Sequence, residues 1–189
     1  MTRVRRRIAA VALAAAGTAA GCGGEVGSAQ SPLCSSVGRP GSPPVVLMAQ
    51  SVPTASLIPC ISLVPAGWSL RGFNAQNGRS DFRLGSDIAG SHAVDVVLVR
   101  GCDVRGATQV PTDQPGASRW ERISSVGEGY RGIRYYRFPG GCVRYEFTLR
   151  GAAQAAPVND VSLAVDFVSR VQLRALVADR SHGRLHLDP

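Results

Sequence analysis

The segment from residue 142 to residue 150 reads Cys-Val-Arg-Tyr-Glu-Phe-Thr-Leu-Arg, and from its second residue it alternates between apolar and polar side chains. Successive side chains of a β-strand point to opposite faces of the sheet. One face of this strand therefore carries Val143, Tyr145, Phe147 and Leu149, and the other carries Arg144, Glu146, Thr148 and Arg150. A strand with one apolar and one polar face is typical of an antiparallel sheet that covers a core on one side.

Neighbouring segments predict further antiparallel strands, because short turns separate them. Pro139-Gly140-Gly141 lies between the segment above and an aromatic strand before it. Asn77-Gly78, whose residues tolerate positive φ, is a strong hairpin signal between two other strands. The predicted strands are 68–76, 79–84, 93–100, 119–126, 130–138 and 142–150. Three prolines between residues 52 and 66 exclude a long helix or a central strand, so we expect a loop there.

The apolar spacing changes near the C-terminus, where it predicts helices. Asn159 or Asp160 would cap a first helix; its apolar residues would be Val161, Leu163, Ala164 and Phe167. Ser169-Arg170-Val171-Gln172 has the form of a capping box and would begin a second helix that stops at Gly183. Residues 185–187 would add a short edge strand. The predicted fold is α+β, an antiparallel sheet with C-terminal helices packed on one face and braced by disulfides.

Residues 1–21 have the three parts of an export signal. Four arginines between positions 3 and 7 form a positive n-region. Residues 8–16 (IAAVALAAA) form an apolar h-region that is too short for a permanent membrane span, which needs about 20 residues. Thr18-Ala19-Ala20-Gly21-Cys22 then places a cysteine after small residues.

This N-terminal segment resembles the lipobox of bacterial lipoproteins, over residues 1 to about 25, with Ala19 in place of the usual Leu. The resemblance implies that Cys22 receives a diacylglycerol thioether and becomes the mature N-terminus. Acyl chains would then hold the protein on the outer face of the cell membrane. The alternative is an ordinary secretory signal cleaved near Ala20, which would leave an oxidisable free thiol at Cys22.

Short segments elsewhere also look similar to uncharacterised actinobacterial envelope proteins. They are Leu57-Ile58-Pro59-Cys60, Pro65-Ala66-Gly67-Trp68 and the stretch from Phe138 to Val143. No activity, cofactor or residue role comes with that resemblance.

The remaining four cysteines, Cys34, Cys60, Cys102 and Cys142, are an even number in an exported chain and predict two disulfides. Four cysteines allow three connectivities. We favour Cys34–Cys60 and Cys102–Cys142, which would staple the N-terminal arm to the domain and join two strand ends. A zinc site is the alternative, but no CxxC or histidine has metal-ligand spacing, so no metal is expected.

Composition limits the classes of partner. Cleavage before Cys22 leaves 168 of the 189 residues and 17 of the 21 basic residues against 13 acidic ones, about +4. This modest charge on an exported chain argues against nucleic acid as a partner. Residues 22–44 are rich in Gly, Ser and Pro and read as a lipidated tether, shortened if Cys34 is paired. Residues 45–189 would form a single domain.

Motifs for catalysis and cofactors are weak. Residues 127–132 match G-x-G-x-x-G in letters, but the match opens an aromatic strand and not a helix, so we expect a turn and no cofactor. His182, His186 and Asp188 form a loose cluster in the terminal tail, where we expect neither metal binding nor acid–base chemistry. No nucleophile elbow, HExxH or P-loop occurs, so no catalytic residue is assigned.

One strand, 130–138, suggests a binding face. Arg131, Tyr135 and Arg137 share a strand face, and arginine with tyrosine suits an anionic or carbohydrate ligand. In the alternative interpretation these arginines pair with carboxylates such as Glu121 or Glu146.

The sequence as a whole favours a lipid-anchored, non-catalytic binding or accessory module of the cell envelope. Its partners would be the membrane and an envelope protein, glycan or lipid. The alternative is an envelope hydrolase with an unrecognised site.

Overall fold

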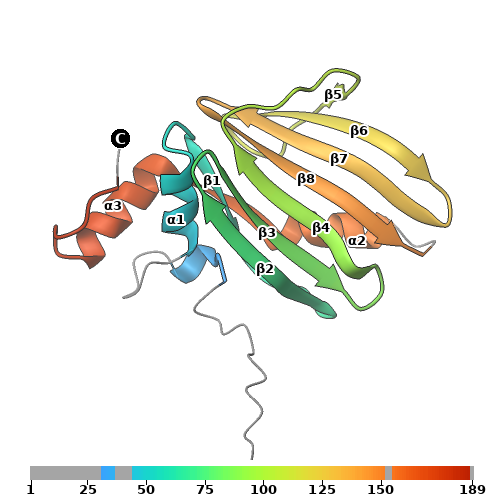
Figure 1. The fold of residues 1–189 in the computed structure, drawn as a ribbon, viewed down its shortest axis with the longest axis horizontal. Helices are drawn as coiled ribbons and strands as arrows, with labels where there is room; N and C mark the ends of the chain where they lie inside the picture. Colours follow the sequence, from blue (N-terminus) through green and yellow to red (C-terminus); the bar gives the residue numbers. More distant parts are fainter. Residues whose placement is uncertain (1–30, 37–43, 152–154, 188–189) are drawn as a thin grey trace, which may run out of the picture.

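The computed structural model describes residues 31–36, 44–151 and 155–187. Most of this region is antiparallel sheet: one sheet of seven strands and one of two, accompanied by three α-helices (Figure 1). The large sheet contains β2 (Trp68–Gln76), β3 (Arg79–Ser86), β4 (Gly90–Val99), β5 (Thr108–Val110), β6 (Ser118–Val126), β7 (Gly129–Phe138) and β8 (Gly141–Arg150). The other elements are a 3-10 turn η2 (Cys34–Ser36), α1 (Pro44–Ser51), β1 (Leu57–Ile61), α2 (Ala155–Ala164), β9 (Val165–Ser169) and α3 (Arg170–Arg180).

The large sheet has the order β2-β3-β4-β8-β7-β6-β5, and every neighbouring pair is antiparallel. Two runs of hairpins, β2–β4 and β5–β8, meet where β4 pairs with β8. The six predicted strands are confirmed, with boundary differences of a few residues. Gly78 has φ 83°, as the predicted Asn77-Gly78 hairpin requires.

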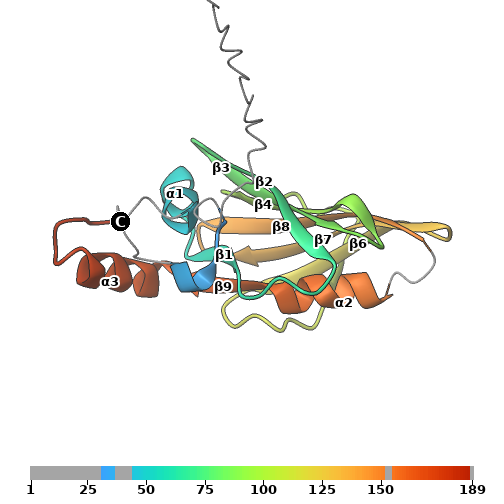
Figure 2. The ribbon, with the colours of Figure 1, turned by 90° about the horizontal axis from the view of Figure 1, so that it is seen from below.

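The two faces of the large sheet differ as the alternation in residues 142–150 predicts. The inner face carries the core, in which Phe82, Val96, Tyr145 and Phe147 are almost fully buried. Figure 2 shows α2 lying along this face, while α3 extends beyond the end of the sheet. The opposite face, which we call the open face, is turned toward the viewer in Figure 1. The expected packing of both C-terminal helices on one face of the large sheet therefore describes α2 but not α3.

A second, two-stranded sheet lies where the sequence predicted a loop and a helix. β1 falls within the expected loop 52–66 and pairs with β9, over Leu57↔Ser169 to Ile61↔Val165. Pro59 is tolerated because β9 is the one strand that forms a ladder with β1 in the described residues, and the bridge on the other side of β1 is made by Ile61. Phe167, predicted on a helix, lies in β9. Its side chain packs on Tyr136, with ring centroids 5.2 Å apart, so burial of an aromatic side chain outweighs helical spacing.

The C-terminal helices begin and end differently from the prediction. α2 already begins at Ala155, so Asn159 and Asp160 lie inside the helix and do not cap it. The predicted capping box of α3 is confirmed: Ser169 accepts from the backbone of Gln172, whose side chain accepts in return. α3 ends at Arg180, and no strand forms at 185–187, where Leu187 is buried without β pairing.

Both disulfides have the favoured connectivity, Cys34–Cys60 and Cys102–Cys142. Leu33 also forms a parallel bridge with Ile61, so this part of the Gly/Ser/Pro-rich segment lies against β1. Disulfides indicate an oxidising, extracellular environment. None of the helices in the described ranges is long and apolar enough to cross a membrane. Cys22 and the signal segment lie outside the described residues.

Candidate functional site

A cluster of charged side chains lies on the inner face between α2 and strands β6 and β7. Arg119 and Glu121 point to this face from β6, and Arg134 lies opposite Glu121 on β7. The Glu121 carboxylate accepts hydrogen bonds from Arg119 at 2.6 Å and from Arg134 at 2.7 Å. Arg134 Nη1 also donates to Ser162 Oγ on α2 at 2.6 Å. The cluster therefore joins α2 to the sheet through one carboxylate and two guanidinium groups.

Burial and neighbouring charges shift the pKa of Glu121 in opposite directions. Partial burial alone would raise its pKa, but the hydrogen bonds and charges of Arg119 and Arg134 outweigh it and lower the pKa below its usual value. Glu121 therefore stays ionised at neutral pH and holds both arginines.

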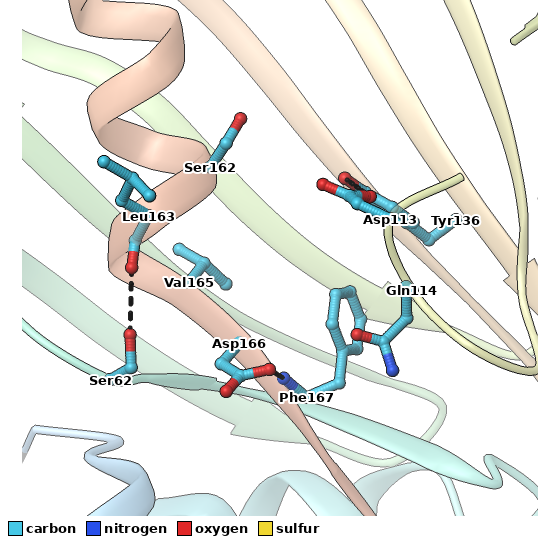
Figure 3. A pocket seen from close by; sticks show the side chains of 9 residues that line it. All are labelled: Ser62, Asp113, Gln114, Tyr136, Ser162, Leu163, Val165, Asp166 and Phe167. Atoms are coloured by element: carbon cyan, nitrogen blue, oxygen red, sulfur yellow. Dashed lines mark hydrogen bonds between the residues drawn. The ribbon is translucent and has the colours of Figure 1, made fainter. Parts of the chain in front are cut away.

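A pocket of about 210 Å³, which we call the α2 pocket, opens beside this cluster (Figure 3). It lies between the end of α2 with β9 on one side and the loop between β5 and β6 on the other. Its lining residues are Ser62, Asp113, Gln114, Tyr136, Ser162, Leu163, Val165, Asp166 and Phe167. Tyr136 is buried and donates its hydroxyl to Asp113 Oδ1 at 3.1 Å. Burial raises the Tyr136 pKa, with Asp113 adding to the effect, so the phenol remains a donor.

The two serine hydroxyls of the α2 pocket are already engaged by backbone carbonyls. Ser62 Oγ donates to the carbonyls of Leu163 and Ala164 at 3.0 and 3.1 Å. Ser162 Oγ donates to Val158 O at 3.1 Å while it accepts from Arg134. Within the described residues, neither serine hydroxyl hydrogen-bonds to a His, Asp or Glu side chain. An activated serine nucleophile needs an adjacent general base, which the hydrogen bonds of these two serines do not supply.

Two polar side chains of the α2 pocket keep free hydrogen-bonding capacity. The side-chain amide of Gln114 bonds to none of the described residues, although its backbone N–H binds Thr112 Oγ1. Asp166, an exposed residue, accepts from Phe167 N with Oδ1, and its Oδ2 bonds to none of the described residues. These groups surround the Phe167 ring, as Figure 3 shows.

The predicted binding face on β7 lies on the open face, away from this pocket. Arg131 and Arg137 are exposed, but Tyr135 is only 3% exposed and its ring lies under the Arg122 guanidinium at 5.9 Å. Tyr135 therefore offers no free ring face. Arg131 and Arg137 are six residues apart on one strand, about 20 Å, so they do not converge on one small group. Neither pairs with Glu121 or Glu146, which bind Arg119, Arg134 and Arg144 instead.

The other sequence candidates stay apart from the pocket. The G-x-G-x-x-G match is confirmed as the turn between β6 and β7 and not as the start of a helix. His182 and His186 follow α3, and Asp188 lies outside the described residues. Among the residues that the structure describes, no group of three or more His, Cys, Asp or Glu could hold a metal ion.

Sequence reasoning missed the α2 pocket because four distant segments build it, one of which is β7 with Tyr136. Residue 62 follows β1, residues 113–114 belong to the β5–β6 loop, and residues 162–167 join α2 to β9. The one local signal is the Pro111 and Pro115 pair, which restrains the loop that carries Asp113 and Gln114. No family model, curated protein sequence or solved structure matches this chain.

Proposed function

We propose that this protein is an exported lipoprotein, acylated on Cys22, that binds a hydroxyl-rich ring in the α2 pocket without transforming it. The observation that carries the binding role is the free acceptor and donor capacity of Gln114 and Asp166 around the Phe167 ring. The lipobox resemblance supports the anchor, and the two disulfides are consistent with export.

The chemistry of the lining favours a ligand that mainly donates hydrogen bonds. Asp166 and Asp113 are acceptors, and the Gln114 amide both donates and accepts. Arg119 Nη1 lies 3.9 Å from Asp113 and offsets part of its charge, which favours a neutral hydroxyl over a cation. A saccharide ring presents hydroxyls at its edge and an apolar face that packs on an aromatic ring.

Pocket size limits the ligand. The volume of about 210 Å³ lies below the range of about 300–1,000 Å³ that holds drug-sized ligands. One sugar ring, or the end of one glycan chain, would enter the pocket. The rest of the ligand would lie over the exposed rim at Leu163.

Binding is tested by titrating the mature protein with methyl glucoside, methyl galactoside and N-acetylglucosamine, observed by ¹H–¹⁵N NMR. We expect shifts at the Gln114 side-chain amide and in residues 162–167 for at least one sugar. Gln114→Ala and Asp166→Ala should each weaken that binding about tenfold, the value of one to two hydrogen bonds. Gln109→Ala, an exposed glutamine on β5 outside the pocket, is the matched control and should have no effect. Tetramethylammonium is titrated as a cationic probe for comparison. A hydroxyl-rich ligand would be refuted if only tetramethylammonium caused shifts, or if no probe caused any.

The anchor is tested by the intact mass of the protein from membranes of an expressing host. A mature chain that begins at Cys22 and carries acyl chains is expected, and Cys22→Ser should move the protein to the soluble fraction. An unacylated wild-type chain in the soluble fraction would show an ordinary secretory signal instead.

A further inference from the structure

A second hollow, of about 390 Å³, lies at the end of the large sheet where the β6–β7 turn meets the end of β8. We call it the distal hollow. The polar side chains that line it are Ser125, Glu128, Arg131, Thr148 and Arg150. It is separate from the α2 pocket, with which it shares no lining residue.

Strand register brings the two arginines together on the open face. Arg131 on β7 lies directly opposite Thr148 on β8, and Arg150 is two positions further along β8. Such diagonal neighbours are about 7–8 Å apart. On the other side of β7, the irregularity in β6 after Ile123 places Ser125 opposite Arg131. Two arginines and two hydroxyl-bearing residues therefore share one end of the open face, where the side chain of Arg150 also lies beside Gly90 at the start of β4.

Arg131 and Arg150 lack partners within the described residues, as Arg137 on the same face does, whereas several other arginines of the open face are paired. Arg79, Arg83 and Arg144 each form an ion pair with a carboxylate on the same face. Arg131 and Arg150 form no hydrogen bond or ion pair through their side chains with any residue that the structure describes. The same holds for the hydroxyls of Ser125 and Thr148 within the described ranges. Glu128 is the single carboxylate in the lining, so the distal hollow has a net charge of +1.

We propose that the distal hollow binds the phosphate group of a phosphate ester. Two guanidinium groups supply forked donors that match phosphate oxygens, and the hydroxyls add further donors. The phosphate could belong to a soluble ester or to a lipid headgroup. The exposed aliphatic side chain of Val126 lines the site beside these groups.

The test uses the mature chain with Cys22→Ser, titrated with glycerol 3-phosphate by calorimetry and NMR, and incubated with sedimenting vesicles. Vesicles of phosphatidylglycerol are compared with vesicles of phosphatidylcholine. We expect Arg131→Gln and Arg150→Gln each to weaken binding about tenfold or more, and Glu128→Gln to tighten it. Arg137→Gln is the matched control, because Arg137 is exposed on the same strand and the same face but lies outside the hollow.

The outcomes distinguish a soluble phosphate ester from a lipid headgroup, and both from unspecific charge attraction. Binding of glycerol 3-phosphate with shifts at Arg131 assigns a soluble ester, and binding of phosphatidylglycerol vesicles alone assigns a headgroup. Equal losses in Arg131→Gln and Arg137→Gln would show unspecific charge attraction and would overturn the site, as would no binding of either probe. Arg131→Gln should leave sugar titrations of the α2 pocket unchanged. Sugar binding in the α2 pocket and phosphate binding in the distal hollow can therefore be refuted independently.

Discussion

Arg170, the first residue of α3, holds the end of α1 in place. Its side chain is buried, and its Nε and Nη2 donate to the carbonyls of Ala55 and Val52, both at 2.8 Å. Nη2 also donates to Ala49 O within the last turn of α1. The guanidinium thus satisfies carbonyls that a helix C-terminus leaves without intrahelical partners, and its charge complements the helix dipole.

We predict that Arg170→Met lowers the free energy of unfolding by about 3 kcal/mol, because it leaves buried carbonyls without donors. Urea denaturation measures the loss. Arg174→Met, an exposed arginine on the same helix, should change stability by less than about 0.5 kcal/mol. Similar values for the two variants would contradict the role of Arg170.

Glu121 predicts a dependence of stability on pH. Its pKa is lowered in the folded protein, so folding is stabilised at pH values above the ordinary glutamate pKa of about 4.3. That stability is lost as the pH falls through the folded pKa. Glu121→Gln should lower the unfolding free energy at pH 7 by about 1–3 kcal/mol. The difference from wild type should shrink toward pH 3, as urea unfolding at several pH values would show; a constant difference would argue against the ionised carboxylate.

For the side chains of β7, the sequence predicted which face each one lies on but not which residues it contacts. Alternation placed Arg131, Tyr135 and Arg137 correctly on one face of β7. It could not show that Tyr135 lies beneath Arg122. That contact depends on the register between β6 and β7, in which Trp120 pairs with Tyr135 and Arg122 lies two residues further along β6. Nor could it show that Glu121 would bind Arg134 across the strands and leave Arg131 free.

Among the elements, hairpins were predicted from sequence and long-range pairs were not. β8 alternates cleanly, and β2 and β3 flank Asn77-Gly78, so the local sequence carries the information. β1 and β9 are short, contain Pro59 and helix-like spacing, and pair across about 100 residues of chain. β9 is held by the packing of Phe167 on Tyr136, and β1 is joined to the N-terminal arm by the Cys34–Cys60 bond; no local stretch of sequence contains either contact.

The junction of β9 and α3 yields a prediction for an element boundary. Ser169 ends β9 and caps α3, so one hydroxyl defines both. Ser169→Ala should lower the unfolding free energy by about 1 kcal/mol, through loss of the capping box. Ser124→Ala, at an exposed serine of the β6 irregularity, is the control and should be neutral. Thermal melts followed by circular dichroism measure both; an unchanged Ser169→Ala would show that β9 pairing alone holds the junction.

At the scale of the molecule, the two disulfides close loops of different kinds. Cys34–Cys60 spans 26 residues and fastens the N-terminal arm, while Cys102–Cys142 spans 40 residues and joins the end of β4 to the start of β8. Loop closure predicts about 3.5 and about 4 kcal/mol of stabilisation respectively.

Replacing both cysteines of a pair by alanine avoids a free thiol. Cys102→Ala with Cys142→Ala should therefore destabilise the domain slightly more than Cys34→Ala with Cys60→Ala, because it opens the longer loop while Cys142 and Cys60 are equally buried. Denaturant unfolding of the two double variants measures the order, and the reverse order would place the main covalent constraint at the N-terminal arm.

The covalent link between the arm and β1 also decides how the protein would carry a mechanical load. Tension applied to the chain before Leu33 reaches Cys34 and passes through the sulfur–sulfur bond directly to Cys60. Residues 35–59, including α1, then form a side loop of the load path and are shielded from stretching. The bridge between Leu33 and Ile61 is loaded first, and the force then enters at β1 and its ladder to β9. A domain pulled from its N-terminus would thus lose its small sheet before its large one.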